Sequence, residues 1–427
     1  MNLLFGEIVD REQSLVALKA LRATVTETLK HAQPLTELVI TACARLRETM
    51  DPAQYLSMLL QAGLSEQAAW RQIAEARAML NPAYLKRRLE RELGPACLEP
   101  ETYLPQNRTE AVREGWKPLG VLLHIAAGNM EALPAFTVIE GLLTGNINLL
   151  KLPAGEDGLS VLLLRELIRL APELAAYMYV FDYPSEETAL IVEMAEIADA
   201  IVVWGSDAAV AAVRKLAKPN KRLIEWGHKL SFAYVTKDCT EEELHALALH
   251  ICRTNQLLCS SCQGIFLDTG DEGEAQEFAK RFVLALEQAA KQEPRVIDPA
   301  MQAHLTLKLR TQALLTTFEG GWLYEGTGGS VQYCTDDALT ASMQFRNCWV
   351  RRLPRERLLE TLFPHRGYLQ TAGLLCAEDE REELSNLLAR AGITRVTRAG
   401  RMSDAYCGAA HDGEYALRKY MKRVSFE

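Results

Sequence analysis

The stretch Leu-Gly-Val-Leu-Leu-His-Ile-Ala at residues 119–126 decides the fold class. It is short, apolar and rich in β-forming residues, and Pro118 and Gly128-Asn129 bound it. A continuous apolar run of this length between turn residues is typical of a strand that is buried on both faces. We therefore predict a buried strand here, and its neighbours in the sequence indicate which kind of sheet contains it.

Downstream of this strand, short apolar runs alternate with amphipathic stretches. The sequence predicts strands at 148–152, 178–181, 200–203 and 221–225, and helices at 134–143, 159–170, 186–195 and 207–216. Strands that alternate with helices imply parallel strands joined by crossover helices. We therefore predict an α/β fold with a doubly wound, nucleotide-binding sheet.

The remaining sequence predicts further layers on either side of this sheet. Residues 1 to about 95 show apolar residues at helical spacing, with prolines at plausible helix starts. A second α/β block follows at about 229–395. We expect four parts: a helical N-terminal layer (1–115), a dinucleotide-binding domain (116–228), a catalytic domain (229–397) and a C-terminal tail (398–427) that returns to the cofactor domain or forms an oligomer interface.

Composition excludes several classes of protein. The 427 residues carry 47 basic and 56 acidic side chains, a net charge of −9, without the basic block that a nucleic-acid binder usually shows. There is no window of about 18 uninterrupted apolar residues, so we expect no membrane span. Residues 1–30 lack the layout of a signal peptide, so the 10 cysteines are expected to be free in a cytoplasmic protein.

The usual dinucleotide fingerprint, G-x-G-x-x-G after a strand, is absent. Val203-Trp204-Gly205-Ser206-Asp207 instead forms a predicted strand-to-helix corner. Gly205 permits a tight turn, and Ser206 or Asp207 can cap the helix. Backbone N–H groups at such a helix start form a small anion site suited to a pyrophosphate, although many such corners are only a turn and a cap.

Cys259 and Cys262 form a C-x-x-C motif that has three interpretations. The first is a structural zinc site with His250 and Cys252, although no second cysteine pair follows downstream. The second is a thioredoxin-like redox pair. The third is a free nucleophilic cysteine in a setting that favours its thiolate. The motif alone does not choose among them.

The residues around this motif resemble the aldehyde dehydrogenase superfamily. Glu225-Trp-Gly-His-Lys resembles its E-x-G-G-K strand turn, and Asn255-Gln-x-x-Cys259 resembles its nucleophile turn, with the glutamate and cysteine 34 positions apart. The segment from Pro118 to Asn129 resembles the strand with the oxyanion asparagine. Gly145-Asn-x-Asn-Leu-Leu-Lys151 resembles the ribose-binding segment, and Gly205-Ser206 matches the phosphate-contacting pair.

Within that superfamily the chain is most similar to the bacterial fatty acyl-CoA reductases of the bioluminescence (LuxC-like) branch. Segments that carry this likeness are His124-Ile-Ala-Ala-Gly-Asn, Leu149-Leu-Lys-Leu-Pro, Trp226-Gly-His-Lys-Leu-Ser-Phe-Ala-Tyr, Cys259-Ser-Ser-x-Gln263, Gly400-Arg-Met and His411-Asp-Gly-Glu. The likeness covers nearly the whole chain, including the helical N-terminal layer.

The resemblance implies NAD(P)H-dependent reduction of an acyl thioester, of fatty acyl type, to an aldehyde. Cys259 would attack the thioester carbonyl and release coenzyme A or another thiol carrier, while Asn129 and the Cys259 backbone N–H stabilise the oxyanion. Donors that fit are acyl-CoA, an acyl carrier protein or a partner acyl-protein synthetase. A homo-oligomer is the superfamily expectation.

The resemblance also implies the cofactor site. It consists of Lys151, Gly205, Ser206, Trp226 and Gly227. Three positions after the lysine, where a glutamate would clasp both ribose hydroxyls, stands the small, uncharged Ala154. NADPH is therefore permitted, with Lys151 able to pair with its 2′-phosphate. NADH stays open, because Glu156 could contact the ribose.

The chain departs from the family pattern at several points. Cys262 stands where the branch commonly has proline, and we expect a bystander rather than a disulfide partner of Cys259. Glu225 is retained, which in hydrolytic aldehyde dehydrogenases activates water, so aldehyde oxidation by Cys259 and Glu225 is the main alternative. A zinc-bearing scaffold is the non-enzymatic alternative. No role follows for His228 or for residues 410–414.

Overall fold

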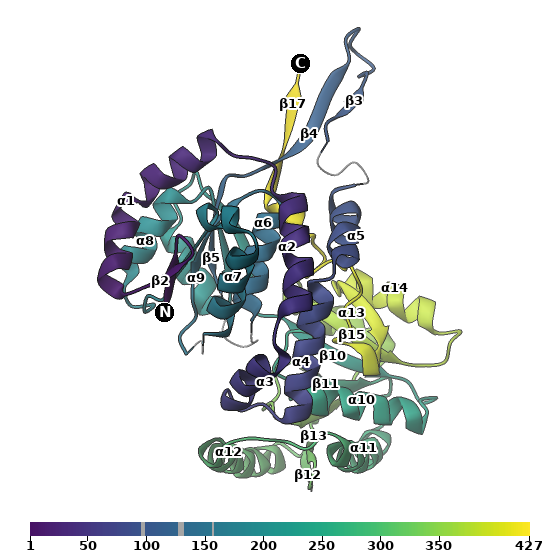
Figure 1. Ribbon diagram of the computed structural model, residues 1–427. Coiled ribbons are helices and arrows are strands. Elements are labelled where there is room, and N and C mark those ends of the chain that lie inside the picture. The colour runs from purple at the N-terminus through teal and green to yellow at the C-terminus, as the bar shows by residue number, and fades with distance from the viewer. Residues whose placement is uncertain (95–98, 127–131, 156–157) are drawn as a thin grey trace. The chain divides into compact units, whose positions relative to one another are not determined.

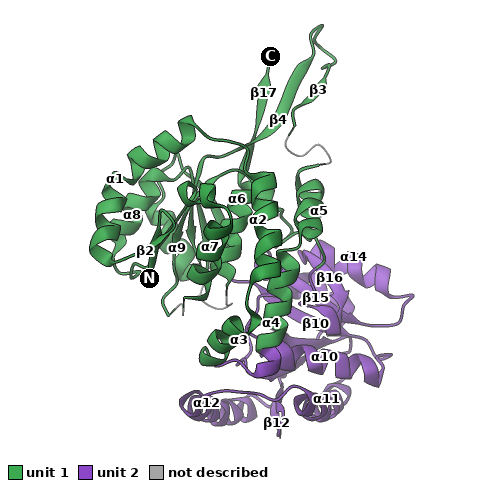
Figure 2. Cartoon of the chain, in the orientation of Figure 1, with its two compact units in different colours: residues 1–62, 69–227, 406–427 green, residues 63–68, 228–405 purple. Residues whose placement is uncertain are grey.

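The structure is a computed structural model whose chain folds into two compact units (Figures 1 and 2). It describes residues 1–94, 99–126, 132–155 and 158–427. Unit 1 comprises residues 1–62, 69–227 and 406–427, and unit 2 comprises residues 63–68 and 228–405. The N-terminal helices therefore belong mainly to the same unit as the first sheet, and the last residues of the chain return to it. The assignment of cofactor and catalytic roles to these parts stays a proposal.

A parallel sheet forms the centre of unit 1. Its parallel strands lie in the order β7-β6-β5-β8-β9. Their bounds are β5 Val121–Ile125, β6 Ile147–Lys151, β7 Met178–Phe181, β8 Ala200–Trp204 and β9 Arg222–Trp226. This confirms the predicted strands and the doubly wound order. The central strand β5 is almost completely buried, as its continuous apolar sequence requires.

Two short strands, β1 (Asn2–Leu4) and β2 (Glu7–Val9), extend this sheet beyond β7. They pair antiparallel, and Leu3 lies opposite Val180 of β7. The helical spacing of apolar residues over 1 to about 95 predicts only helices, and this prediction is wrong for β1 and β2. Strands of three residues are too short to show an alternating pattern.

Crossover helices cover both faces of the sheet of unit 1. Their bounds are α6 Leu133–Leu143, α7 Leu159–Leu170, α8 Thr188–Ile197 and α9 Asp207–Leu216. The chain moves outward from β5 to β7 and then in the opposite direction to β8 and β9. Because crossovers are right-handed, the two directions place α6 and α7 on one face and α8 and α9 on the other. The strand order reverses between β5 and β8, where doubly wound sheets bind their ligands.

The N-terminal helices pack onto these crossover helices. They are α1 Arg11–Lys30, α2 Thr36–Thr49, α3 Pro52–Gln61, α4 Glu66–Met79 and α5 Pro82–Leu93. Proline occupies the first turn of α3 and α5, where its missing N–H costs nothing, and the preceding Asp51 and Asn81 cap the helices. Helix α2 packs against α6 and α7, and α1 packs against α8.

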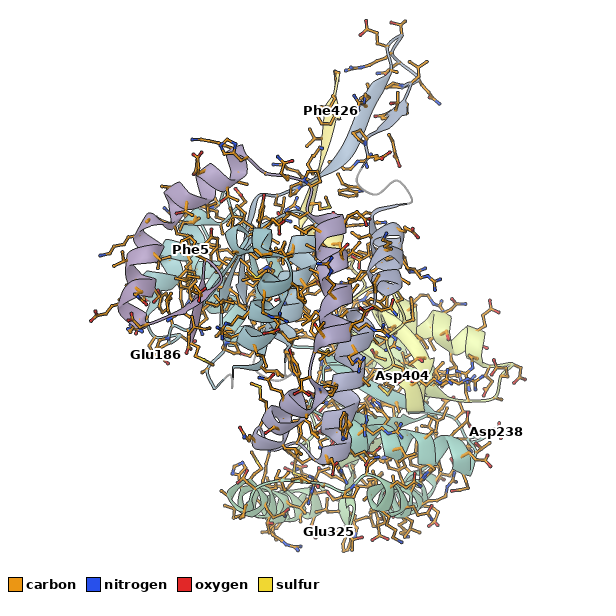
Figure 3. The ribbon with its side chains drawn as sticks, in the orientation of Figure 1. Phe5, Glu186, Asp238, Glu325, Asp404 and Phe426 are labelled. Atoms are coloured by element: carbon orange, nitrogen blue, oxygen red, sulfur yellow. The ribbon has the colours of Figure 1, made fainter. Side chains whose placement is uncertain are left out.

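The C-terminal segment completes unit 1. Strand β17 (Met421–Phe426) pairs antiparallel with β4 (Val112–Pro118), which also pairs with β3 (Glu101–Tyr103). Phe426 marks the end of this ribbon (Figure 3). Before β17, the short helix α15 (Ala416–Lys419) leads to Tyr420, which is fully buried. The Tyr420 carbonyl accepts hydrogen bonds from the Leu119 N–H and the Asn146 side chain, both at 3.1 Å.

Unit 2 contains a second sheet, in the order β12-β13-β14-β11-β10-β15-β16. All neighbours are parallel except β12 and β13. The strands are β10 Leu230–Val235, β11 Cys262–Leu267, β12 Trp322–Gly326, β13 Gly329–Tyr333, β14 Asn347–Arg352, β15 Leu369–Leu375 and β16 Arg395–Arg398. The helices are α10 Glu241–Thr254, α11 Glu272–Gln292, α12 Pro299–Phe318, α13 Leu358–Leu362 and α14 Arg381–Ala391. The described residues also form short 3₁₀ turns, namely η1 Pro172–Ala176 in unit 1 and η2 Arg355–Arg357, η3 Phe363–His365 and η4 Ala399–Arg401 in unit 2.

Two apolar clusters cover the faces of this second sheet. Ile251 and Phe282 belong to the cluster beneath α10 and α11, and Phe232 and Leu384 belong to the cluster on the other face. At Gly264 of β11 a Cβ atom would lie 2.0 Å from the ring of Trp349. Glycine is therefore required there, because the indole occupies that space. Among the described residues, the helices lack the length and apolarity that crossing a bilayer requires.

Candidate active site

Cys259 lies in the turn between α10 and β11. Helix α10 ends at Thr254, and the next two residues, Asn255 and Gln256, have left-handed backbone angles of φ 45° and 63°. Two consecutive residues in this region reverse the chain sharply, at some conformational cost. Cys259 is partly exposed in this turn.

Buried glutamine side chains hold the turn in place. The Gln256 Nε2 donates to the carbonyls of Cys262 and Gln263 at 3.0 and 3.2 Å, and the Gln263 Nε2 donates back to the Gln256 carbonyl at 3.2 Å. The Gln263 Oε1 accepts from the N–H and hydroxyl of Ser342. Since both glutamine side chains are buried, these bonds are shielded from water and fix the turn to β11.

Two further contacts tie the turn to neighbouring strands. The Ser231 hydroxyl of β10 donates to the Cys259 carbonyl at 2.7 Å and accepts from the Thr371 N–H of β15 at 3.1 Å. The Arg346 Nε donates to the Asn255 side chain at 3.0 Å. These contacts hold the backbone of the turn that contains Cys259.

The two cysteines of the C-x-x-C motif lie in different environments. Cys262 is fully buried at the start of β11, and burial raises the pKa of its thiol to about 12. Its sulfur donates to the Gly264 carbonyl at 3.2 Å. A thiol in this state is almost entirely protonated at neutral pH and is a poor nucleophile. Cys259, which is partly exposed, is therefore the better candidate for the nucleophile.

The zinc alternative finds no support in the geometry. The His250 Nε2 accepts a hydrogen bond from the Cys262 backbone N–H at 3.3 Å, which occupies that ring nitrogen. Burial lowers the pKa of His250 to about 4, so the ring is neutral and structural. Within the described residues, no three His, Cys, Asp or Glu side chains are arranged to hold a metal ion.

Gly205 and Ser206 lie at the point in unit 1 where the strand order reverses. They follow the carboxyl end of β8, and Ser206 caps α9 by accepting from the Ala209 N–H at 3.3 Å. At Gly205 a Cβ atom would lie 3.1 Å from the Ala209 side chain, so a larger residue would crowd the corner. The start of α9 therefore offers backbone N–H groups at the position where such sheets bind phosphates.

Lys151 ends β6 at the same edge of this sheet. The residue is 4% exposed, and its Nζ donates to the Ser185 hydroxyl at 2.9 Å. Burial lowers the pKa of Lys151, and the nearby Asp182 and Glu186 oppose this change. Among the described residues, this ammonium donates to the neutral Ser185 hydroxyl, and an ammonium has three N–H donors.

Glu225 makes an ion pair that the sequence did not indicate. Its carboxylate, at the end of β9, receives both Nε and Nη2 of Arg214 from α9, the second contact at 2.5 Å. The side chain of Glu225 is 24% exposed and that of Arg214 is 63% exposed. A carboxylate with both oxygens bonded to a guanidinium is less available to take a proton from water.

Trp226 and Gly227 follow Glu225, and the indole of Trp226 lies in an aromatic cluster. It stacks on Trp204 with ring centroids 5.3 Å apart, and His411 lies 5.0 and 5.1 Å from the two indoles. The Lys419 Nζ lies 4.8 Å from the Trp226 ring. Both indole N–H groups are buried without a hydrogen-bond partner among the described residues. Buried donors are rarely left without an acceptor, so these two N–H groups call for an explanation.

The tail motif, for which the sequence predicts no role, contributes His411 to this cluster. The backbones of His411 and Glu414 exchange two hydrogen bonds of 2.8 Å, while Asp412 and Gly413 have φ values of 51° and 80°. This is the geometry of a tight hairpin turn, for which Asp-Gly is a strong sequence signal. The turn places His411 against the two indoles, a contact that the sequence could not show.

Two of the predicted residues remain to be placed. Asn129, the expected oxyanion donor, lies outside the described residues. His228 is exposed beside Gly227. The structure therefore brings Gly205, Ser206, Lys151, Glu225 and Trp226 to strand ends of one sheet, while Cys259 lies in unit 2.

Solved structures similar to this chain are aldehyde dehydrogenases. A putative aldehyde dehydrogenase from Anabaena variabilis matches with a TM-score of 0.73 and 14% identity, over 98% of this chain and 93% of that one. Lactaldehyde dehydrogenase from Escherichia coli matches with a TM-score of 0.72 and 15% identity, over 97% and 91%. The fold is therefore that of an aldehyde dehydrogenase, as predicted.

The family model described as acyl-CoA reductase (LuxC) matches residues 32–423, and the chain belongs to this family. A long-chain acyl-protein thioester reductase from Vibrio harveyi is 24% identical over 79% of this chain and 70% of its own length. The enzyme of the same name from Aliivibrio fischeri is 22% identical over 73% of this chain and 64% of its own length. The chain thus spans about two thirds of these relatives.

Proposed function

We propose that the protein reduces an acyl thioester, of fatty acyl type, to the corresponding aldehyde through a covalent intermediate on Cys259. Family membership supports the class of reaction, and the relatives named acyl-protein thioester reductases agree with it. The observation that carries the proposal is the turn at Cys259, in which a partly exposed thiol is held by backbone contacts next to a buried, unreactive cysteine.

The first step is acyl transfer to the enzyme. The Cys259 thiolate attacks the thioester carbonyl carbon, the bond from that carbon to the carrier sulfur breaks, and the carrier leaves as a thiol after taking up a proton. Asn129 and the Cys259 backbone N–H donate to the oxyanion that forms on the way. The Ser231 hydroxyl bond to the Cys259 carbonyl holds the peptide unit of the nucleophile in a fixed place.

The second step is reduction of the enzyme-bound acyl group. A reduced nicotinamide, when bound, supplies a hydride to the carbonyl carbon; the carbon–sulfur bond to Cys259 then breaks, leaving an aldehyde and the thiolate. Residues of unit 1 fit such a cofactor: the start of α9 with Ser206 for the pyrophosphate, Lys151 for the ribose side, and the unpartnered indole N–H of Trp226 for a polar group.

NADPH is the proposed cofactor, and two residues near the end of β6 support this choice. Lys151 is a buried ammonium that can pair with a 2′-phosphate, and Ala154 carries no charge that would repel one. One similar solved structure, 3,6-anhydro-L-galactose dehydrogenase, was determined in complex with NAP, with a TM-score of 0.70 and 17% identity over 98% of this chain and 92% of that one. NADH remains the second candidate.

The pair between Arg214 and Glu225 favours reduction over the hydrolytic alternative. Hydrolysis of the acyl-enzyme needs a general base that accepts a proton from water. Both oxygens of Glu225 are bonded to Arg214, which holds this carboxylate away from that task. The acyl-enzyme then persists until the hydride arrives, and the product is an aldehyde rather than an acid.

Mass spectrometry of the intact protein tests the proposal. After mixing with acyl-CoA of several chain lengths, the peptide that contains Cys259 should carry the acyl mass, and addition of NADPH should release an aldehyde. Acid formed from an aldehyde and NADP⁺ without coenzyme A would favour the hydrolytic function instead. Acyl-CoA, acyl carrier protein and acyl-protein donors are compared in the same assay to identify the donor. We also propose a homo-oligomeric state and a cytoplasmic location.

A further inference from the structure

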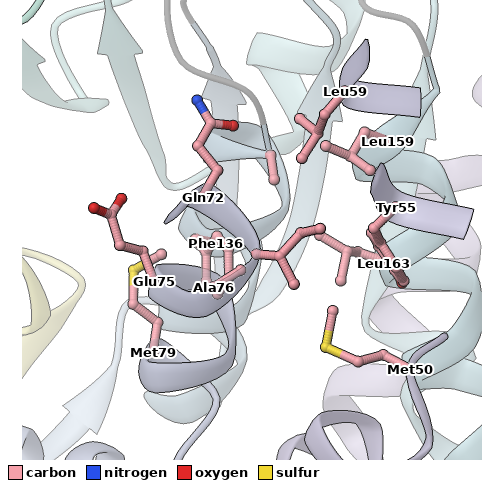
Figure 4. A pocket seen from close by; sticks show the side chains of 12 residues that line it. Met50, Tyr55, Leu59, Gln72, Glu75, Ala76, Met79, Phe136, Leu159 and Leu163 are labelled. Atoms are coloured by element: carbon pink, nitrogen blue, oxygen red, sulfur yellow. The ribbon is translucent and has the colours of Figure 1, made fainter. Parts of the chain in front are cut away.

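Unit 1 contains an apolar pocket that the proposed chemistry does not yet use (Figure 4). It has an empty volume of about 440 Å³, which includes its open mouth. Helices α3, α4, α6 and α7 contribute to its wall, together with Met50, which follows the end of α2. The side chains that contact this space are those of Met50, Tyr55, Leu59, Gln72, Ile73, Glu75, Ala76, Met79, Ala132, Phe136, Leu159 and Leu163.

The pocket lies at the ligand-binding edge of the sheet. Ala132 immediately precedes α6, and Leu159 is the first residue of α7. These helices follow the carboxyl ends of β5 and β6, and ligands of doubly wound sheets bind outside that edge. Asn129, the proposed oxyanion donor, is only three residues before Ala132 in the sequence. The wall of the pocket is therefore continuous in sequence with the segment assigned to the reacting carbonyl.

The lining of the pocket has the chemistry of a hydrocarbon site. Most lining side chains are aliphatic or aromatic, and the polar Gln72 and Glu75 lie together at one side in Figure 4, away from Leu59, Leu159 and Leu163. The pocket therefore has a polar side and an apolar side, as an amphiphile with a polar head and an apolar tail requires. None of the described lining residues is basic, and this lining is unsuited to the phosphates of a nucleotide.

Two features of the lining indicate that the pocket adapts to an occupant. Met50 and Met79 have unbranched side chains that adjust to irregular shapes, and methionine is common where a surface accepts variable apolar ligands. The hydroxyl of Tyr55 is buried and has no hydrogen-bond partner among the described residues, and burial raises its pKa to about 12. The hydrogen-bonding capacity of this hydroxyl, which lies beside the pocket, is thus not satisfied by the described residues.

We propose that this pocket binds the hydrocarbon tail of the acyl group, so that α3 and α4 of the N-terminal layer determine which chain lengths are reduced. The inference rests on the proposed function and extends it from the reacting carbonyl to the chain behind it. Each methylene moved from water into an apolar site improves binding by about fourfold. A pocket that accepts several methylenes therefore discriminates strongly between short and long acyl groups.

Narrowing the pocket tests the proposal through chain-length preference. Ala76→Phe adds a ring to the wall of the pocket, whereas Ala78→Phe adds the same ring to an exposed position of α4 outside it. With Ala76→Phe, kcat/KM for a long-chain acyl-CoA should fall at least tenfold, while that for butyryl-CoA stays within twofold. Phe136→Ala, which enlarges the pocket, should shift the preference toward longer chains. Circular dichroism verifies that each variant is folded.

A binding measurement separates this inference from the proposed function. Fluorescence of cis-parinaric acid, a C18 fatty acid, reports occupancy without any turnover. Weaker binding of the probe by Ala76→Phe than by Ala78→Phe supports the assignment of the pocket to the hydrocarbon tail. If wild-type protein binds the probe in this way but reduces no thioester, the proposed function fails and the pocket assignment stands. Equal binding of this probe by wild type, Ala76→Phe and Ala78→Phe overturns the pocket assignment. A loss of rate by Ala76→Phe that is the same for all chain lengths also overturns it.

Discussion

Replacement of Arg214 by alanine should convert part of the aldehyde product into free acid. In the structure both oxygens of Glu225 are bonded to Arg214, so this carboxylate is less available as a general base. The variant leaves Glu225 without this partner at the end of β9. Water that reaches the acyl-enzyme can then lose its proton to Glu225, and the fraction of acyl groups that end as carboxylic acid should rise.

The size of this effect follows from the exposure of the pair. Ion pairs near the surface contribute up to about 1 kcal/mol, and this one belongs at the upper end because it is bidentate and the Glu225 side chain is only 24% exposed. A free energy of about 1 kcal/mol is a factor of about five in the population of unpaired Glu225. The acid fraction should therefore rise about fivefold.

The assay separates the two products by gas chromatography after reaction of acyl-CoA with NADPH. Arg214→Lys keeps one positive charge without the two-pronged contact and should give an intermediate acid fraction. Lys215→Ala removes the neighbouring exposed cation of α9 and should leave the products unchanged. The double variant Arg214→Ala, Glu225→Gln should lower the acid fraction to the wild-type level or below it. An acid fraction that is equal in all four variants and the wild type would refute the role assigned to the pair.

Three further predictions follow from other groups. Cys259→Ala should abolish acylation detected by mass spectrometry, whereas Cys262→Ala, which removes a buried thiol with a pKa of about 12, should retain it; the reverse result would exchange their roles. Lys151→Met should raise KM for NADPH about tenfold or more and change KM for NADH less, and an equal change in both would remove the proposed contact with the 2′-phosphate. His124 and His250 have folded-state pKa values lowered by burial to about 4 from 6.5. The unfolded chain therefore binds more protons than the folded chain in this range, so the free energy of unfolding should fall by roughly 3 kcal/mol per histidine as pH drops from about 6.5 to 4. Urea titrations at several pH values measure this free energy. A constant free energy of unfolding across that range would contradict the assignment.

The first sheet could be predicted from the sequence because its central strands have a continuous apolar pattern. Strand β14 was missed, although it lies inside the second sheet between β13 and β11. Its sequence, Asn347 to Arg352, includes two arginines, and this composition is typical of a surface segment. Arg351 is nevertheless buried, and it donates to the Ala338 carbonyl and, at 3.0 Å, to the Thr340 hydroxyl. Tertiary partners of this kind cannot be inferred from the local pattern.

The parts of the candidate site whose geometry depends on short sequence motifs could be predicted from the sequence. The helix cap at Ser206 and the turn at Cys259 involve neighbouring residues, so the spacing of these residues in the sequence indicates them. The ion pair between Arg214 and Glu225 and the contact of His411 with Trp226 join different elements. Neither leaves a local signal, because each depends on how helix, strand and tail pack in three dimensions.

The place of Tyr420 in unit 1 has a consequence for how the protein is made. The carbonyl of this residue binds Leu119 and Asn146 beside the first strands of the sheet, yet nearly three hundred residues of chain separate them. During synthesis, residues 228–405 leave the ribosome before that partner does and hold enough buried apolar residues to fold as their own unit. We therefore expect the residues just before β5 and β6 to lack this contact until residue 420 has been synthesised.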